Sequence, residues 1–188
     1  MSWLKADAGT WVWRVLPIGS VLVSKVVDQL SRGILWRALF VDLSLLAGWI
    51  VGWLIVEADH LFYATMCNPQ ELTCQRVKKE FEKKDLKRMW GILQETKFER
   101  TKLPIRNVLT GFVMTGLGIW VVISSGNVFA SGLVFGFGIR LLSEFLADRD
   151  YRKWYWIFAR EFSESEHRGI VLAWMGGLIW QWLALLRG

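Results

Sequence analysis

Seven polar residues of this 188-residue chain have the side-chain types that metal and acid–base chemistry require. They stand in four places: Glu57, Asp59 and His60; Asn107; Arg140 and Glu144; and His167. Two carboxylates and an imidazole within four positions form a ligand set that suits zinc or a harder divalent cation. On a helix, Glu57 and His60 share one face. The alternative interpretation is a polar helix end at the level of the lipid headgroups.

Arg140 lies roughly seven residues inside an apolar segment, which is about 10 Å below the segment's end on a straight helix. A charge at that depth costs ~2.5–3.5 kcal/mol in a bilayer unless a partner neutralises it. Glu144 lies one helical turn further along the same face, so the spacing predicts an Arg140–Glu144 ion pair. Arg140 then either holds Glu144 in place or binds an anionic ligand.

Four long apolar segments position these groups: residues 38–56, 108–125, 128–147 and 169–186. Each is near the roughly 20 residues that a helix needs to cross a bilayer core. The chain is 53% hydrophobic, which is too apolar for an ordinary soluble domain. If the four helices alternate in direction, the seven polar residues meet at one membrane face. We therefore predict an all-α, polytopic membrane protein whose single membrane domain covers residues 1–188.

Basic residues indicate which connections stay in the cytoplasm. Residues 57–106 hold eleven of the 23 Lys and Arg residues, whereas residues 125–127 hold none. Because basic loops near membrane ends stay inside, we predict a protein integral to the plasma membrane with the 57–106 loop in the cytoplasm. The net charge of +6 then reflects orientation and attraction to anionic lipid headgroups, and needs no nucleic acid. Cys67 and Cys74 are expected to remain thiols in that reducing compartment.

Further stretches show the spacing of amphipathic helices. Residues 10–31 form one that lies in the membrane interface or packs half-buried against the bundle; the alternative is a fifth crossing. The 57–106 loop is expected to hold two short helices, over 70–83 and 85–95, against the cytoplasmic surface. The 148–168 connection is expected to continue as helix along the interface.

Gly132 and Gly136 form a small-xxx-small pattern, which lets two helices approach closely. One interpretation is packing within the chain, and the other is a face that binds a second copy or another protein. We expect packing within the chain.

Several of these positions together resemble a bacterial family, the membrane-bound metal-dependent hydrolase-like family related to inner-membrane LexA-binding proteins. Glu57-x-Asp59-His60 is similar to that family's Asp-x-Asp-His after its first span. Asn107 stands where the family has a histidine, and Arg140 with Glu144 stands where it has His-x-x-x-Asp. The resemblance covers residues 38–147 and implies a shared bundle with a polar pocket on its cytoplasmic side.

The departures from the family's pattern limit what this pocket can do. Asn107 and Arg140 replace two imidazoles of the family. The metal ligands that remain are Glu57, Asp59, His60, Glu144 and His167. A guanidinium at position 140 can hold the same carboxylates without a metal ion. The resemblance therefore implies a degenerate relative that is not catalytic.

Three function classes follow from these observations. We expect a structural or binding component of the membrane without a cofactor. The first alternative is a metal-dependent hydrolase with a reduced ligand set around a divalent cation, and the second is a small channel or transporter. A di-iron site is a further alternative, because Glu57-x-x-His60 and Glu164-x-x-His167 repeat the spacing of di-iron bundles.

Overall fold

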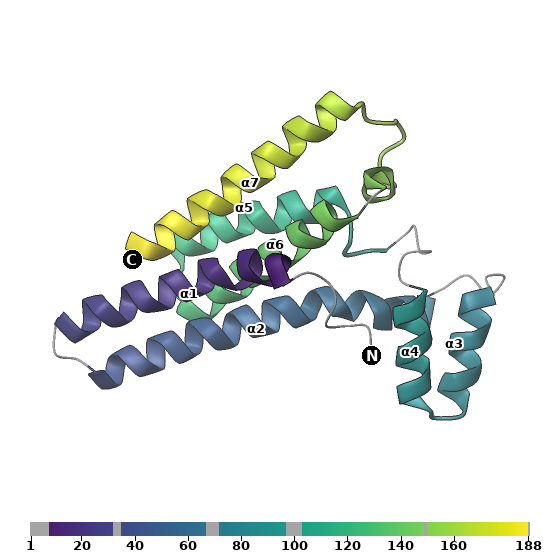
Figure 1. Ribbon diagram of the computed structural model, residues 1–188, viewed down its shortest axis with the longest axis horizontal. Coiled ribbons are helices and arrows are strands. Elements are labelled where there is room, and N and C mark those ends of the chain that lie inside the picture. The colour runs from purple at the N-terminus through teal and green to yellow at the C-terminus, as the bar shows by residue number, and fades with distance from the viewer. Residues whose placement is uncertain (1–7, 32–34, 67–71, 97–102, 149, 188) are drawn as a thin grey trace.

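The computed structural model describes residues 8–31, 35–66, 72–96, 103–148 and 150–187, and these form helices without any strand (Figure 1). The helices are α1 (Ala8–Ser31), α2 (Leu35–Met66), α3 (Leu72–Glu82), α4 (Leu86–Glu95), α5 (Val108–Ser124), α6 (Val128–Ala147), the short 3-10 helix η1 (Tyr151–Tyr155) and α7 (Glu164–Arg187). The all-α class predicted from the sequence is confirmed.

Five long helices, α1, α2, α5, α6 and α7, lie side by side as a bundle, and α3 and α4 form a hairpin beyond one end of it (Figure 1). Helices α2 and α6 run parallel to each other, and α5 and α7 form a second parallel pair that runs the opposite way. The end of α2, the start of α5, the end of α6 and the start of α7 therefore meet at one end of the bundle. This is the arrangement that the polar residues of the sequence predicted.

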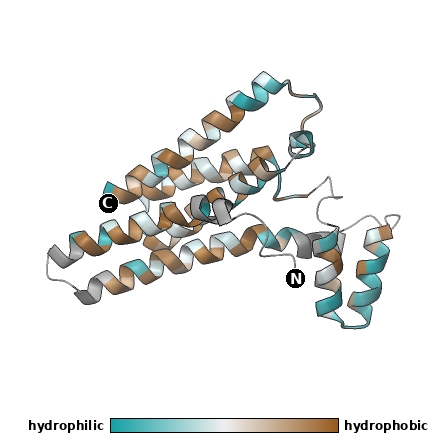
Figure 2. Cartoon of the chain, viewed as in Figure 1, coloured by the Kyte–Doolittle hydropathy of each residue, from teal (hydrophilic) through white to brown (hydrophobic). Residues whose placement is uncertain are grey.

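Within the described residues, three helices are long and apolar enough to cross a membrane: Leu39–Asp59 within α2, Val128–Ala147 and Glu164–Arg187. Helix α5, predicted as a fourth crossing, is apolar but has 17 residues. Hydropathy separates the two parts of the molecule, because apolar residues dominate the bundle and hydrophilic ones dominate the α3–α4 hairpin (Figure 2).

Helix α1 lies lengthwise along the bundle rather than across its end (Figure 1). Its Ile18 and Val21 are buried in one cluster with Leu45 of α2 and Phe135 of α6. Across α1 and α7, the Trp182 indole N–H donates to the hydroxyl of Ser20 at 2.9 Å. The sequence left several placements open for the helix over residues 10–31, and the structure shows it packed against the bundle.

Helices α2 and α6 approach each other closely, and glycines make this close approach possible. A side chain at Gly48 or Gly52 of α2 would collide with backbone carbonyl oxygens of α6. One at Gly132 or Gly136 of α6 would collide with carbonyl oxygens of α2. The two backbones thus touch, as small-residue seams allow. The Gly132–Gly136 pattern serves packing within the chain, as predicted, and its partner pair on α2 was not identified from the sequence.

Helices α3 and α4 confirm the two short helices predicted in the 57–106 loop. They pack on each other through Val77, Met89 and Leu93, which are all buried. The turn between them places Lys84 at φ +58°, in the left-handed region that non-glycine residues adopt infrequently.

The prediction of continuous helix over residues 148–168 is wrong. Asp148 ends α6, and its carboxylate accepts a hydrogen bond from the Trp154 indole at 3.1 Å. Among the described residues of this connection, only those of η1 are helical before α7 begins at Glu164. The reason is a capping box: the Ser163 backbone N–H donates to the Glu166 carboxylate at 2.9 Å, and the Glu166 N–H donates to the Ser163 hydroxyl at 3.3 Å. This reciprocal pair starts a new helix.

Candidate functional site

Four charged side chains from three parts of the chain meet at this end of the bundle, and we call them the charged cluster: Glu57, Arg106, Arg140 and Glu144. Arg140 of α6 binds Glu57 of α2 and also Glu144, at 2.7 Å from the latter. Arg106, which lies just before α5, binds Glu144 through two contacts, at 2.6 and 3.2 Å. It also lies 3.9 Å from Glu57.

The charged cluster is largely removed from solvent, since its four side chains are 11–24% exposed. The two guanidinium ions and two carboxylates alternate, so that each carboxylate faces both arginines. Charge-assisted hydrogen bonds of this kind are about twice as strong as neutral ones. The pair predicted from the spacing, Arg140 with Glu144, is present, and it belongs to a network that joins α2, α6 and the start of α5.

Asp59 is completely buried and has a structural role in the described structure. One of its carboxylate oxygens accepts the backbone N–H of Ile105 at 3.0 Å, and the other accepts that of Arg106 at 2.9 Å. Asp59 therefore fixes the segment that carries Arg106 against α2. His60 lies within α2, but its side chain is outside the part that the structure describes.

Asn107 also acts on the backbone rather than on the charged cluster. It is the N-cap of α5: its side-chain oxygen accepts the Thr110 backbone N–H at 2.8 Å. Its amide nitrogen donates to the carbonyl oxygen of Pro104. Asparagine is a favoured N-cap because its side chain satisfies an N–H that the helix leaves open. At this position Asn107 sets where α5 begins.

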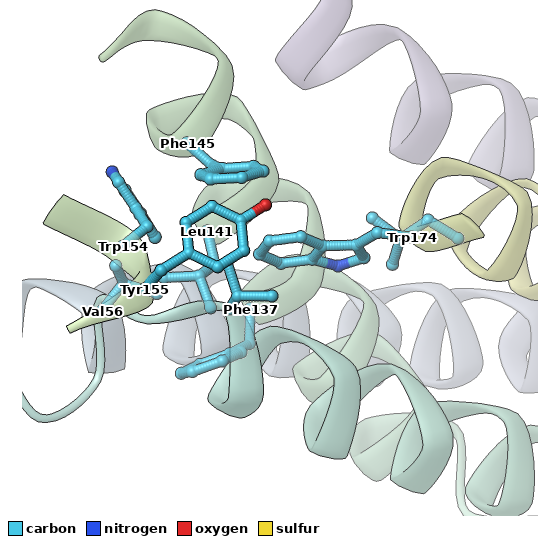
Figure 3. Packing of buried hydrophobic residues seen from close by; sticks show 9 residues of the cluster. Val56, Phe137, Leu141, Phe145, Trp154, Tyr155 and Trp174 are labelled. Carbon is cyan, nitrogen blue, oxygen red and sulfur yellow. The ribbon is translucent and has the colours of Figure 1, made fainter. Parts of the chain in front are cut away.

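The structure does not bring His167 to the carboxylates. Its ring stacks on Tyr151 at 4.1 Å, its Nδ1 lies 3.0 Å from the hydroxyl of Tyr155, and Phe145 meets its edge at 5.2 Å. Burial, followed by the charges of neighbouring groups, raises the pKa of Tyr155 to about 12. Its hydroxyl therefore stays neutral and shares a hydrogen bond with the imidazole. His167 therefore contacts an aromatic core through Phe145. Phe145, Trp154 and Trp174 of this core lie close together (Figure 3).

Four of the five predicted metal ligands have described side chains, and the structure divides them among three surroundings; the side chain of His60 lies outside the described part. Within the described residues, no three His, Cys, Asp or Glu side chains gather closely enough to hold a metal ion. The ligand set of Glu57, Asp59, Glu144 and His167 is divided between the charged cluster, a backbone anchor and an aromatic core.

Two residues beside the charged cluster were not identified from the sequence. Trp53 of α2 lies under the guanidinium of Arg140, 4.8 Å from its Cζ, and Arg14 of α1 lies 6.0 Å from the same ring. These are cation–π distances. The sequence did indicate Arg14: it stands among apolar residues, about as far from the start of α1 as Arg140 stands from the end of α6.

Cys74 is buried and disulfide-bonded, which corrects the expectation of a thiol. The chain has one other cysteine, Cys67, which lies outside the described residues. The expectation of a thiol rested only on the reducing compartment predicted for this loop.

Comparisons of this chain with protein-family models, with curated proteins and with solved structures give no match. The resemblance to the hydrolase-like family therefore rests on the residues of this chain alone.

Proposed function

We propose that this chain is an integral membrane protein that crosses the bilayer with α2, α5, α6 and α7, and that it is a structural or binding component without catalytic activity. Its charged end would be a degenerate form of the pocket that metal-dependent hydrolase-like membrane proteins carry. In this proposal the partner of the bundle is the lipid bilayer, and a homo-oligomer or a second protein is a further partner class.

One observation carries the proposal: Arg140 binds carboxylates from two helices at once, Glu57 of α2 and Glu144 of α6. A metal ion that bridges two carboxylates occupies the same electrostatic position. An arginine stays protonated in proteins, so its charge is permanent. With Arg106 also on Glu144, the carboxylates are neutralised by the chain itself. A metal-dependent hydrolase with a divalent cation, and a small channel or transporter, are the alternatives to this proposal.

The metal content of the purified protein tests this proposal. We expect well under one zinc, manganese or iron per chain after purification without chelators, because the carboxylates already have arginine partners. The matched control is the Glu57→Gln, Glu144→Gln double variant, measured by the same elemental analysis. About one metal ion per chain in the wild type, lost in that variant, would promote the hydrolase reading instead.

We propose that the protein lies in the inner (plasma) membrane and that its 57–106 loop faces the cytoplasm. The basic residues support this, because positive charge near the membrane acts while the chain inserts. The disulfide at Cys74 points the other way, since disulfides persist mainly in oxidising compartments. The basic residues decide the proposed orientation, because positive charge acts during insertion, before the cysteines can pair.

Cysteine labelling decides the orientation. We expect a membrane-impermeant maleimide to label this chain only in permeabilised cells, and to need a reductant to do so, because Cys74 is disulfide-bonded. A cysteine introduced at Ser125, in the connection at the opposite end, is the control and should be labelled in intact cells of a variant without Cys67 and Cys74. Labelling of the native cysteines in intact cells, after an impermeant reductant, would reverse the proposed orientation.

A further inference from the structure

Arg14 differs from the two arginines of the charged cluster because no carboxylate binds it in the described structure. Its side chain is half-buried, and its Nε is buried without a hydrogen-bond acceptor. Arg140, Glu144 and Glu57 are all close enough to act on Arg14 electrostatically. Its described contact is with the ring of Trp53, at 6.0 Å. A buried guanidinium donor without an acceptor is costly, so an acceptor is to be expected.

The carboxylates near Arg14 are already held by other donors. Glu57 and Glu144 bind Arg140 and Arg106, and the carboxylate of Asp59 accepts two backbone N–H groups. The Nε of Arg140 is also buried without an acceptor. Since Glu57 and Glu144 are held by Arg106 and Arg140, neither carboxylate forms an ion pair with Arg14 in the described structure.

We propose that Arg14 and Arg140, whose guanidinium groups both lie near the ring of Trp53, form a binding site for a phosphate group. This inference rests on the proposed function, because it requires the charged end of the bundle to bind rather than to catalyse. Guanidinium forks match phosphate oxygens in geometry and charge better than ammonium groups do. The same chemistry would take the phosphate of a lipid headgroup or a free phosphate ion.

The surroundings of Arg14 favour a lipid as the source of that phosphate. Arg14 stands about 9 Å inside α1 from Ala8, and its neighbours Val15 and Leu16 are exposed apolar residues. Acyl chains would cover such a surface. An arginine at this depth is long enough to reach the headgroup level, where lipid phosphates lie.

The experiment measures retention of phosphatidylglycerol by the full-length protein in a zwitterionic detergent, by native mass spectrometry. Parallel arms use phosphatidylcholine and inorganic phosphate. Arg14→Gln should weaken phosphatidylglycerol binding about tenfold or more, as expected for the loss of one charged hydrogen-bonding partner. Arg168→Gln is the matched control, because it removes the same charge at the same end of the bundle but from an exposed side chain. Binding by that variant should equal the wild type.

Displacement of phosphatidylglycerol by millimolar inorganic phosphate, in the wild type but not in Arg14→Gln, would assign the site to free phosphate. Equal retention by wild type and Arg14→Gln, or equal weakening in Arg168→Gln, would overturn the site. Should Arg14→Gln unfold, Arg14→Lys keeps the charge without the fork and should still bind several-fold more weakly than wild type. Metal analysis of the same samples is independent, so failure of this site and failure of the proposed function are distinguishable.

Discussion

Replacing Gly52 with alanine is expected to lower the free energy of unfolding by ~3 kcal/mol or more, at the upper end of the range for overpacked sites. A methyl group at Gly52 would collide with the backbone carbonyl of Leu133 in α6. A flexible side chain could move aside, but a helical carbonyl is held by its own hydrogen bond. The two helices must therefore separate, and separation also weakens the contacts at Gly48, Gly132 and Gly136. Unfolding in detergent, followed by tryptophan fluorescence against added denaturing detergent, measures the change.

The matched control is Gly116→Ala in α5, a helical glycine with open space where the methyl group would go. There alanine should be neutral or stabilise by up to ~1 kcal/mol, because it favours helix over the unfolded chain. If both variants lose the same stability, the cause is not the α2–α6 seam. If Gly52→Ala matches the wild type, the two backbones are not in contact in the folded protein.

The bounds of a helix were predictable where nearby residues determine where it begins or ends. Helix α6 has the predicted bounds because Asn127 caps its start, with its side chain accepting the Ala130 N–H at 3.1 Å. Helix α2 continues past residue 56 because no glycine or proline follows that would stop it before Met66. The capping box at Ser163 and Glu166 is also visible in the sequence, and it would have corrected the helix expected across 148–168.

The candidate site was predictable only in part, because its members differ in how they find their partners. Arg140 and Glu144 share one helix, so their spacing alone predicts the ion pair. Arg106 and Arg14 reach the same place from distant parts of the chain, through the anchor of Asp59 and the packing of α1. Sequence spacing cannot show such meetings. His167 was placed at the correct end of the bundle, but its aromatic neighbours hold it away from the carboxylates.

Arg140→Met is expected to destabilise the protein by ~3 kcal/mol, near the low end for a broken buried ion pair because the carboxylates keep some exposure. The loss arises because Glu57 and Glu144 both lose a bound cation in a poorly solvated place. Glu144 keeps Arg106 at 2.6 Å, whereas Arg106 lies 3.9 Å from Glu57. The Arg140→Met, Glu57→Gln double variant should therefore recover at least half of the lost stability, measured by the same unfolding titration.

A surface ion pair provides the control for that experiment. Arg168 and Glu164 are 2.8 Å apart, but their side chains are 73% and 71% exposed, and such pairs contribute ~0–1 kcal/mol. Arg168→Met should thus change stability by less than ~1 kcal/mol. A similarly small effect of Arg140→Met would mean that water reaches the charged cluster freely. Failure of Glu57→Gln to restore stability would mean that Arg140 acts through its packing on Trp53 rather than through its charge. Only destabilisation followed by recovery supports a guanidinium that replaces a bridging cation.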